Sequence, residues 1–211
     1  MTKSFKTLGL AAVLSVTSAL AANAALIDFT DGSLVPAGDT LTGTESGGWT
    51  LVGVPGPLNN AEAGPGAIGP LVGETDGIGI GETDDEVTAV RESLTITFDK
   101  PVIITGLYFL DLFVAGDDSS KEIVEVSGDA TASFEGVANN NVDTVGFFGE
   151  VGLSLDGTTF TFTPAETNDS FGRPDFALAG SEVELAPIPL PAGILLLGGA
   201  LAGLGVARRR S

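Results

Sequence analysis

The sequence has no histidine and no cysteine among its 211 residues, and it has one tryptophan and one tyrosine. These absences exclude Ser-His-Asp and Cys-His nucleophile systems, the common zinc sites and a disulfide framework. Trp49 and Tyr108 are also too few to line a sugar-binding cleft with several aromatic platforms. The list of chemistries open to this chain is therefore short.

Positive charge is scarce as well and is unevenly placed. The chain carries 28 acidic and 9 basic side chains, for a formal net charge of −19. Every carboxylate lies between Asp28 and Glu184, whereas five of the nine cations lie in the two ends: Lys3, Lys6, Arg208, Arg209 and Arg210. The middle of the chain is expected to repel nucleic acid and anionic lipid and to attract cations.

The N-terminus has the pattern of a secretory signal peptide. Lys3 and Lys6 precede an apolar run over residues 8–20, and the small-residue sequence "AANA" follows. Such a pattern predicts that residues 1–24 are removed by signal peptidase, with Ala22 and Ala24 as the small residues at the cleavage site. We expect the mature protein to begin at Ala25 and to be secreted.

The C-terminus combines an apolar segment with a terminal arginine cluster. Residues 188–207 carry no charge, which is close to the length that a helix needs to cross a bilayer. Arg208, Arg209 and Arg210 then mark the cytoplasmic side. The pattern predicts a transmembrane helix in the inner membrane, with the body outside and the tail inside.

The order of features in this tail resembles a known class of sorting signals. "IPLPA", then a helix rich in Leu and Gly, then the arginine cluster, is similar to the PEP-CTERM signals in their VPLPA-CTERM variant, with Ile188 in place of valine. These occur on exported proteins of Gram-negative bacteria that make exopolysaccharide, where exosortase-type membrane enzymes are thought to process the tail. Carried over to residues 187–211, the resemblance implies recognition and cleavage at the motif formed by Pro189, Leu190, Pro191 and Ala192.

The same resemblance implies a destination at the cell surface or in the extracellular matrix, but no activity for the body. A second, weaker similarity to other PEP-CTERM-type surface proteins covers residues 76–106, with a Gly-Ile-Gly stretch, an acidic cluster and a "PV" strand. That similarity implies a β-sandwich and adds no chemistry.

Between the two ends, residues 25–186 form one predicted domain made of strands. "ESLTITF" alternates Leu94, Ile96 and Phe98 with hydroxyl residues, which is the period of a half-buried strand. "TTFTFT" repeats the pattern directly after Asp156-Gly157, a dipeptide that favours a type I′ hairpin turn. Further predicted strands cover residues 26–29, 49–54, 102–113, 122–126, 130–134, 145–148, 175–178 and 183–185.

The number and spacing of these strands predict an all-β fold, an antiparallel β-sandwich of jelly-roll-like type. The run 102–113 is apolar on both alternating faces and predicts a central strand covered on both sides. Asp111 interrupts the run. Because an unpaired buried carboxylate is costly, Asp111 must reach the strand end, pair, or bind a cation, and the strand end is our expectation.

Residues 53–81 contain nine glycines and four prolines and predict a long loop, which could be an insertion, a linker or the rim of a binding site. Four carboxylates follow it within five residues: Glu82, Asp84, Asp85 and Glu86. Oxygen ligands at this density suit calcium, and Asp175 could supply a distant ligand. The spacing does not fit an EF-hand. The alternative is that acidic runs serve solubility or salt tolerance.

Taken together, these patterns predict an exported, non-catalytic protein of the cell envelope or exopolysaccharide matrix that acts through structure, adhesion, or weak glycan or calcium binding. The rival hypothesis is a carboxylate-based glycan hydrolase, because such enzymes need only two carboxyl groups at a suitable separation. Two acidic side chains facing each other in a cleft beside Trp49 would favour the rival.

Overall fold

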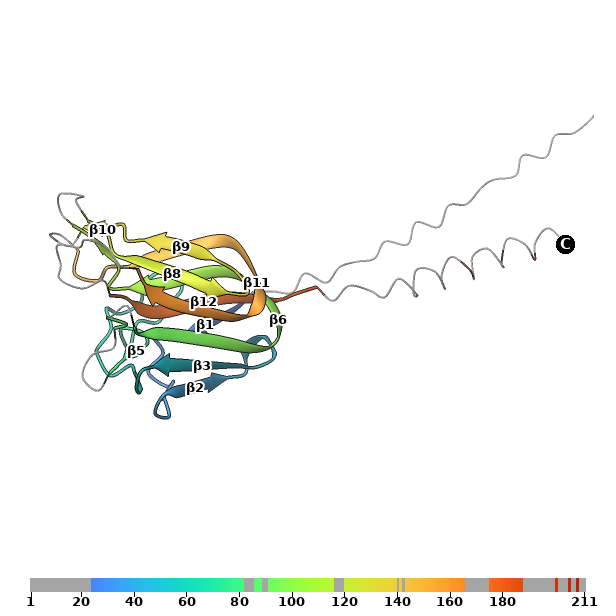
Figure 1. The fold of residues 1–211 in the computed structure, drawn as a ribbon, viewed down its shortest axis with the longest axis horizontal. Coiled ribbons are helices and arrows are strands. Elements are labelled where there is room, and N and C mark those ends of the chain that lie inside the picture. Colours follow the sequence, from blue (N-terminus) through green and yellow to red (C-terminus); the bar gives the residue numbers. More distant parts are fainter. Residues whose placement is uncertain are drawn as a thin grey trace, which may run out of the picture.

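The predicted all-β class is confirmed by a computed structural model of the protein, which describes residues 24–81, 86–88, 91–115, 120–139, 141, 143–165 and 175–187 and the single residues 200, 205 and 208. Eight antiparallel strands form one sheet that curls around an apolar core (Figure 1). The main path runs in the order β1 (Ala25–Asp28), β12 (Ala177–Leu185), β6 (Ser93–Leu110), β11 (Phe148–Pro164), β8 (Ile123–Gly128) and β9 (Ala132–Glu135).

Two further strands join this path from the side. β3 (Trp49–Val54) pairs with β6, and β2 (Thr40–Gly43) pairs with β3. Two short pairs lie outside the main sheet: β4 (Leu58–Asn59) with β5 (Gly79–Ile80), antiparallel, and β7 (Phe113–Val114) with β10 (Ala138–Asn139), parallel. A 3-10 turn, η1 (Glu45–Gly47), precedes β3.

Strand β6 is paired along both of its edges. Residues 93–98 pair with β3 and residues 102–110 pair with β12, while β11 runs along the opposite edge from Leu94 to Phe109. The expected central strand is therefore confirmed, and it is continuous with the "ESLTITF" strand that the sequence presents separately. Pro101 is exposed and lies between the two paired halves of β6. No neighbouring strand needs a backbone N–H donor at this position, so proline is tolerated.

The hairpin turn predicted at Asp156-Gly157 is wrong. Both residues lie inside β11, where they pair with Ile103 and Val102 of β6, and the register shifts just beyond Gly157. β6 provides hydrogen-bonding partners along nearly the whole length of β11. Residues 156 and 157 therefore continue the strand beside β6 and do not form a turn. A glycine at such a break in register is typical of a β-bulge.

The other strand predictions differ from the structure mainly at their ends. The strand predicted over residues 49–54 matches β3, and the strands predicted near β1, β8 and β9 are shifted by one or two residues. The strands predicted over residues 175–178 and 183–185 form the single strand β12, which begins at Ala177, so residues 175 and 176 precede it. Strand β11 begins only at Phe148, and β2, β4, β5 and β10 are not predicted by the sequence patterns.

The glycine- and proline-rich segment over residues 53–81 is more ordered than a plain loop. It contains the β4–β5 pair, and it buries Leu58, Leu71, Ile78 and Ile80. Leu71 packs in a second apolar cluster with Tyr108, Leu110, Ala177 and Ala179, on the side of β6 and β12 that faces away from the main core. The segment thus covers the second face of the central strand.

The main core is centred on aromatic rings that come from separate strands. Phe109 of β6 is fully buried and lies 5.7–6.2 Å, between ring centroids, from four other phenylalanines. These partners are Phe134, Phe148, Phe162 and Phe176. Phe109 therefore connects β6 to β9, to both ends of β11 and to the segment before β12.

Replacing Phe109 with alanine should lower the free energy of unfolding by about 3–5 kcal/mol, because the cavity removes contacts with four rings at once. Val151→Ala is the control, since Val151 is 64% exposed and its loss should change stability by at most about 0.5 kcal/mol. Denaturant unfolding of both variants provides the comparison. Equal midpoints would contradict the central place given to Phe109.

Candidate functional site

Carboxylates gather at the end of the sheet where β6 finishes and β12 begins. Leu110, the last residue of β6, pairs with Ala177, the first residue of β12, so that Asp111 and Asp175 lie at the same end. The amide of Val87 donates a hydrogen bond of 2.8 Å to the carbonyl of Phe176, which brings Glu86 to the segment of Asp175. We call Asp76, Glu86, Asp111 and Asp175 the carboxylate cluster.

Two glycines allow the backbone to approach closely at this end. Gly146 has φ +59°, and a Cβ there would lie 2.7 Å from the Leu112 nitrogen, beside the hydrogen bonds that hold Asp111 and Leu112 against residues 145 and 146. Gly77 has φ +100°, and its Cβ would lie 2.8 Å from the carbonyl oxygen of Leu178. Any larger residue would separate the segments that bring Asp76 and Asp111 together.

Asp76 and Asp111 form a carboxyl pair. Their side chains share a hydrogen bond, which requires a proton on one of them. Burial raises the pKa of Asp111 to about 9, and the negative charges of Asp76, Glu86 and Asp175 add to the effect. Burial also raises the pKa of Asp76. At neutral pH the pair therefore holds one proton, centred on Asp111.

One atom of this pair stands out. Oδ2 of Asp111 is buried and has no hydrogen-bond partner. Asp111 lies just past the end of β6, as expected. Its carboxyl is nevertheless too buried there to be charged at neutral pH, because burial raises its pKa. Pairing is one of the three alternatives that the sequence leaves open for Asp111, beside a place at the strand end and cation binding. The sequence indicates them because a carboxylate interrupts an apolar run.

The structure brings together two of the residues predicted to bind calcium. Glu86 and Asp175 both act electrostatically on Asp111, whereas Glu82, Asp84 and Asp85 lie outside the described residues. Within the described ranges, no three acidic side chains converge in a way that could hold a metal ion. Calcium binding stays a prediction.

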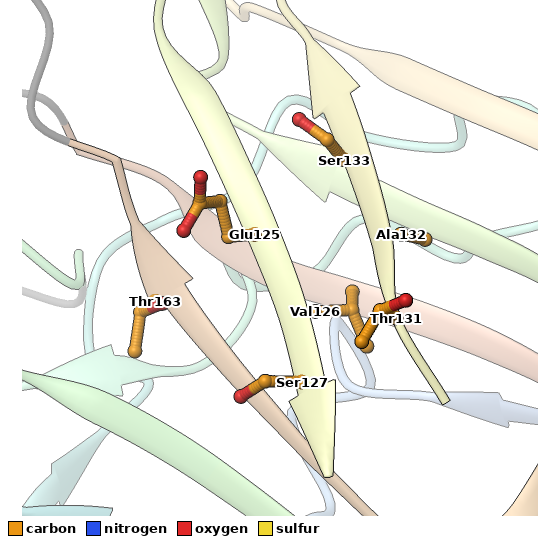
Figure 2. Close-up of a pocket in the computed structure, with 7 residues that line it drawn as sticks. All are labelled: Glu125, Val126, Ser127, Thr131, Ala132, Ser133 and Thr163. Carbon is orange, nitrogen blue, oxygen red and sulfur yellow. The ribbon is translucent and has the colours of Figure 1, made fainter. Parts of the chain in front are cut away.

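A second feature is an open groove on the solvent side of the sheet. It has a volume of about 370 Å³ and crosses β11, β8 and β9. Figure 2 shows Glu125 and Ser127 on β8 between Thr163 on β11 and Thr131 and Ser133 on the β9 side. Sequence reasoning missed this groove, although its signal was present in the hydroxyl residues that alternate with core residues.

The groove offers hydrogen bonds and little else. Hydroxyl groups both donate and accept, and Glu125 is the one carboxylate among the residues that line it. A two-carboxylate glycosidase needs a second acid that faces the first. This lining fits the binding of a hydroxylated ligand better than the cleavage of one.

Trp49 and Tyr108 are not sugar-stacking platforms. Trp49 is 2% exposed, packs edge-on against Phe29 and donates its indole N–H to Glu45 at 2.8 Å. Tyr108 is buried and donates its hydroxyl to Glu182 at 2.6 Å. Burial, followed by this bond, raises the pKa of Tyr108 to about 12.

Most residues of the two predicted processing sites lie outside the described residues: Ala22, Pro189, Leu190, Pro191, Ala192, Arg209 and Arg210. Ala24 and Arg208 are described and exposed, and Arg208 has a helical backbone. In the part of the chain that the structure describes, no helix is both long and apolar enough to cross a bilayer.

No protein-family model, curated protein or solved structure matches the chain. A proposal for its function therefore depends on its own side chains and their geometry.

The carboxyl pair predicts an unusual dependence of stability on pH. Because the pKa of Asp111 is about 9 in the folded protein and near 3.8 in the unfolded chain, the folded state binds one more proton between these values. This contribution to stability is complete below about pH 4 and is lost as pH rises to about 9. In chelating buffer, Asp111→Asn should flatten this decline in thermal midpoint. A variant with the slope of the original protein would contradict the shared proton.

Proposed function

We propose that the chain is an exported protein, sorted to the cell surface or the exopolysaccharide matrix, whose β-domain acts without catalysis through structure, adhesion and glycan binding. One observation carries the proposal. The strands run from Ala25 to Leu185, which is the interval between the predicted signal cleavage after Ala24 and the sorting segment that begins at Pro187. The two expected processing points thus bracket the folded domain.

The geometry of the two ends supports this proposal. Ala25 of β1 pairs with Val183 of β12, so both processing points leave the domain at the same end of the sheet. A domain held by its C-terminal tail then stands on this end. The carboxylate cluster lies at the start of β12, roughly 27 Å away along a nine-residue strand.

The finer fold is part of the proposal. One edge of β6 pairs with β3 before Pro101 and with β12 after it, and β11 follows β6 on both sides of this break and pairs with β8 only along residues 160–164. The curled sheet can therefore close on itself as a jelly-roll-like β-sandwich. The N-terminal signal would export the chain, the apolar tail would arrest it in the inner membrane, and an exosortase-type enzyme would recognise "PLPA".

Changing the sorting motif should change the mass and location of the protein. With Pro191→Ala and Ala192→Leu together, or with Arg208–Arg210 deleted, we expect the uncleaved form to accumulate in the membrane fraction. Immunoblotting and mass spectrometry of membrane, surface and medium fractions measure this in a Gram-negative host with an exosortase.

Val151→Ala, on the exposed surface of β11, is the matched control and should be processed as the original chain is. If the tail variants show the mass and location of the unaltered protein, the sorting proposal is wrong.

We further propose that calcium organises the carboxylate cluster, because a specific observation favours it. The buried Oδ2 of Asp111 lacks a partner, and three more carboxylates act on the same group. Oxygen ligands of this kind suit calcium, which accepts six to eight of them in flexible geometry. Because no three acidic side chains of the described residues converge as a metal site, Glu86 and Asp175 would need the other predicted ligands, Glu82, Asp84 and Asp85, to complete the calcium site.

Calcium removal tests this second proposal. At a hundred times its dissociation constant, calcium should stabilise the protein by about 2.7 kcal/mol, or roughly 5–10 °C in thermal midpoint, relative to chelator. Magnesium should not reproduce the shift, and Asp175→Asn should reduce it. A shift that any divalent salt reproduces equally, or none at all, would return the acidic residues to a role in solubility.

A further inference from the structure

The solvent side of the sheet carries a regular array of hydroxyl groups. The outward residues of six neighbouring strands, β2, β3, the first half of β6, the second half of β11, β8 and β9, are mostly threonine and serine. We call this array the hydroxyl face. Its members are Thr40, Thr42, Thr50, Ser93, Thr95, Thr97, Ser127, Ser133, Thr159, Thr161 and Thr163.

Strand register aligns these residues in rows across the sheet. One row runs through Thr42, Thr50, Thr97 and Thr159, each paired directly with the next. The neighbouring row runs through Thr40, Val52, Thr95, Thr161 and Ser127. Neighbouring hydroxyl residues are about 4.8 Å apart across strands and about 7 Å apart along a strand, which is comparable with the size of a sugar ring.

Most of these hydroxyls are not used within the described part of the molecule. Thr95 and Thr161 bond to each other at 2.9 Å, and Thr40 bonds to Asp39. The side chains of Thr42, Thr50, Thr97, Thr159 and Thr163 make no hydrogen bond to another described residue. Because threonine is stiff at χ1, holding such hydroxyls against a ligand costs little additional entropy.

The charge of the face is as distinctive as its hydroxyls. In a chain of net charge −19, the outward strand residues of the face include three carboxylates, Asp99, Glu125 and Glu135, and Lys121 pairs with Glu135 at 2.8 Å. The face also lacks the exposed Trp, Tyr and Arg side chains that anchor most protein interfaces. Its chemistry fits a neutral ligand that hydrogen-bonds along its length.

The groove of Figure 2 continues this face at its β9 edge. Thr163 pairs with Glu125, and Glu125 pairs with Ser133, so the groove is a third row of the same array. The carboxylate of Glu125 can accept two hydroxyl donors there, and bonds from O–H to a carboxylate are among the stronger ones.

We propose that the hydroxyl face is the docking surface for a neutral polysaccharide, with the groove around Glu125 holding one of its sugars. This inference rests on the proposed function, since it names the matrix component that the domain binds. Each contact is weak, but a polymer repeats its sugars, and several rows engage it at once. An acidic polysaccharide is disfavoured by the net charge of the chain.

The test compares polysaccharides of different charge against a variant without the hydroxyls. Thr50→Val, Thr97→Val and Thr159→Val together remove three of the four hydroxyls of one row while keeping its shape and its preference for strand. Binding of the full chain in detergent is measured by its retardation in native gels that contain dextran, laminarin, galactomannan or acidic alginate. Thr144→Val, an exposed threonine in the loop before β11, is the matched control.

At least one neutral polymer should retard the original chain, and the triple variant should weaken that binding at least tenfold, while Thr144→Val leaves it unchanged. Glu125→Gln should weaken it severalfold. Far-UV circular dichroism and the fluorescence of Trp49 check that each variant is folded. Alginate should bind poorly.

Three results would overturn the proposal: no retardation by any neutral polymer, equal retardation of the triple variant, or stronger binding of alginate. Self-association that the triple variant abolishes would instead make the face an interface between copies, which also contradicts it. Processing of the tail is a separate measurement, so a failure of the sorting proposal and a failure of the hydroxyl face are distinguishable.

Discussion

The pairing of β6 along both edges is the interaction on which the rest of the structure depends. β11 occupies one edge, and the other edge is divided between β3 and β12, so that six of the eight strands of the main sheet take their positions from β6 directly or through one neighbour. The inward residues of β6, with Phe109 among them, then form the centre of the core. Where β6 begins, its outward hydroxyls contribute to the hydroxyl face, and where it ends, Asp111 enters the carboxylate cluster.

The local sequence pattern predicts a strand well where buried and exposed residues alternate. It fails where a strand partner far away in the sequence determines the conformation. Alternating apolar residues identify β3 and the first half of β6, because one face of each is buried. The continuous apolar run identifies the second half of β6, which is covered on both faces. Asp156-Gly157 favours a turn locally, yet the continuous edge of β6 holds the chain extended through it. The ends of β6 and β11 likewise depend on partners far away in the sequence, which a window of a few residues does not contain.

The two sites illustrate different limits of sequence reasoning. The sequence shows that Asp111 is unusual, because it is a carboxylate within an apolar run. It does not show the partner, because Asp76 lies 35 residues away and is brought to Asp111 by close backbone approaches at Gly77 and Gly146. The hydroxyl face is different, because all its residues are visible as the polar half of each strand. What the sequence lacks is the register that aligns Thr42, Thr50, Thr97 and Thr159 across four strands.

The distribution of charge is compatible with the proposal that the tail tethers the domain. A carboxylate cluster close to an anionic membrane surface would be repelled, and the repulsion fades over a Debye length of about 8 Å at physiological salt. Strand β12 places the cluster roughly 27 Å from the end where the tail leaves, which is several Debye lengths. The hydroxyl face runs along the side of the sheet with few charges of its own. If the tail holds the domain at the membrane, the arrangement keeps the cluster away from lipid and leaves a neutral side open to the surrounding matrix.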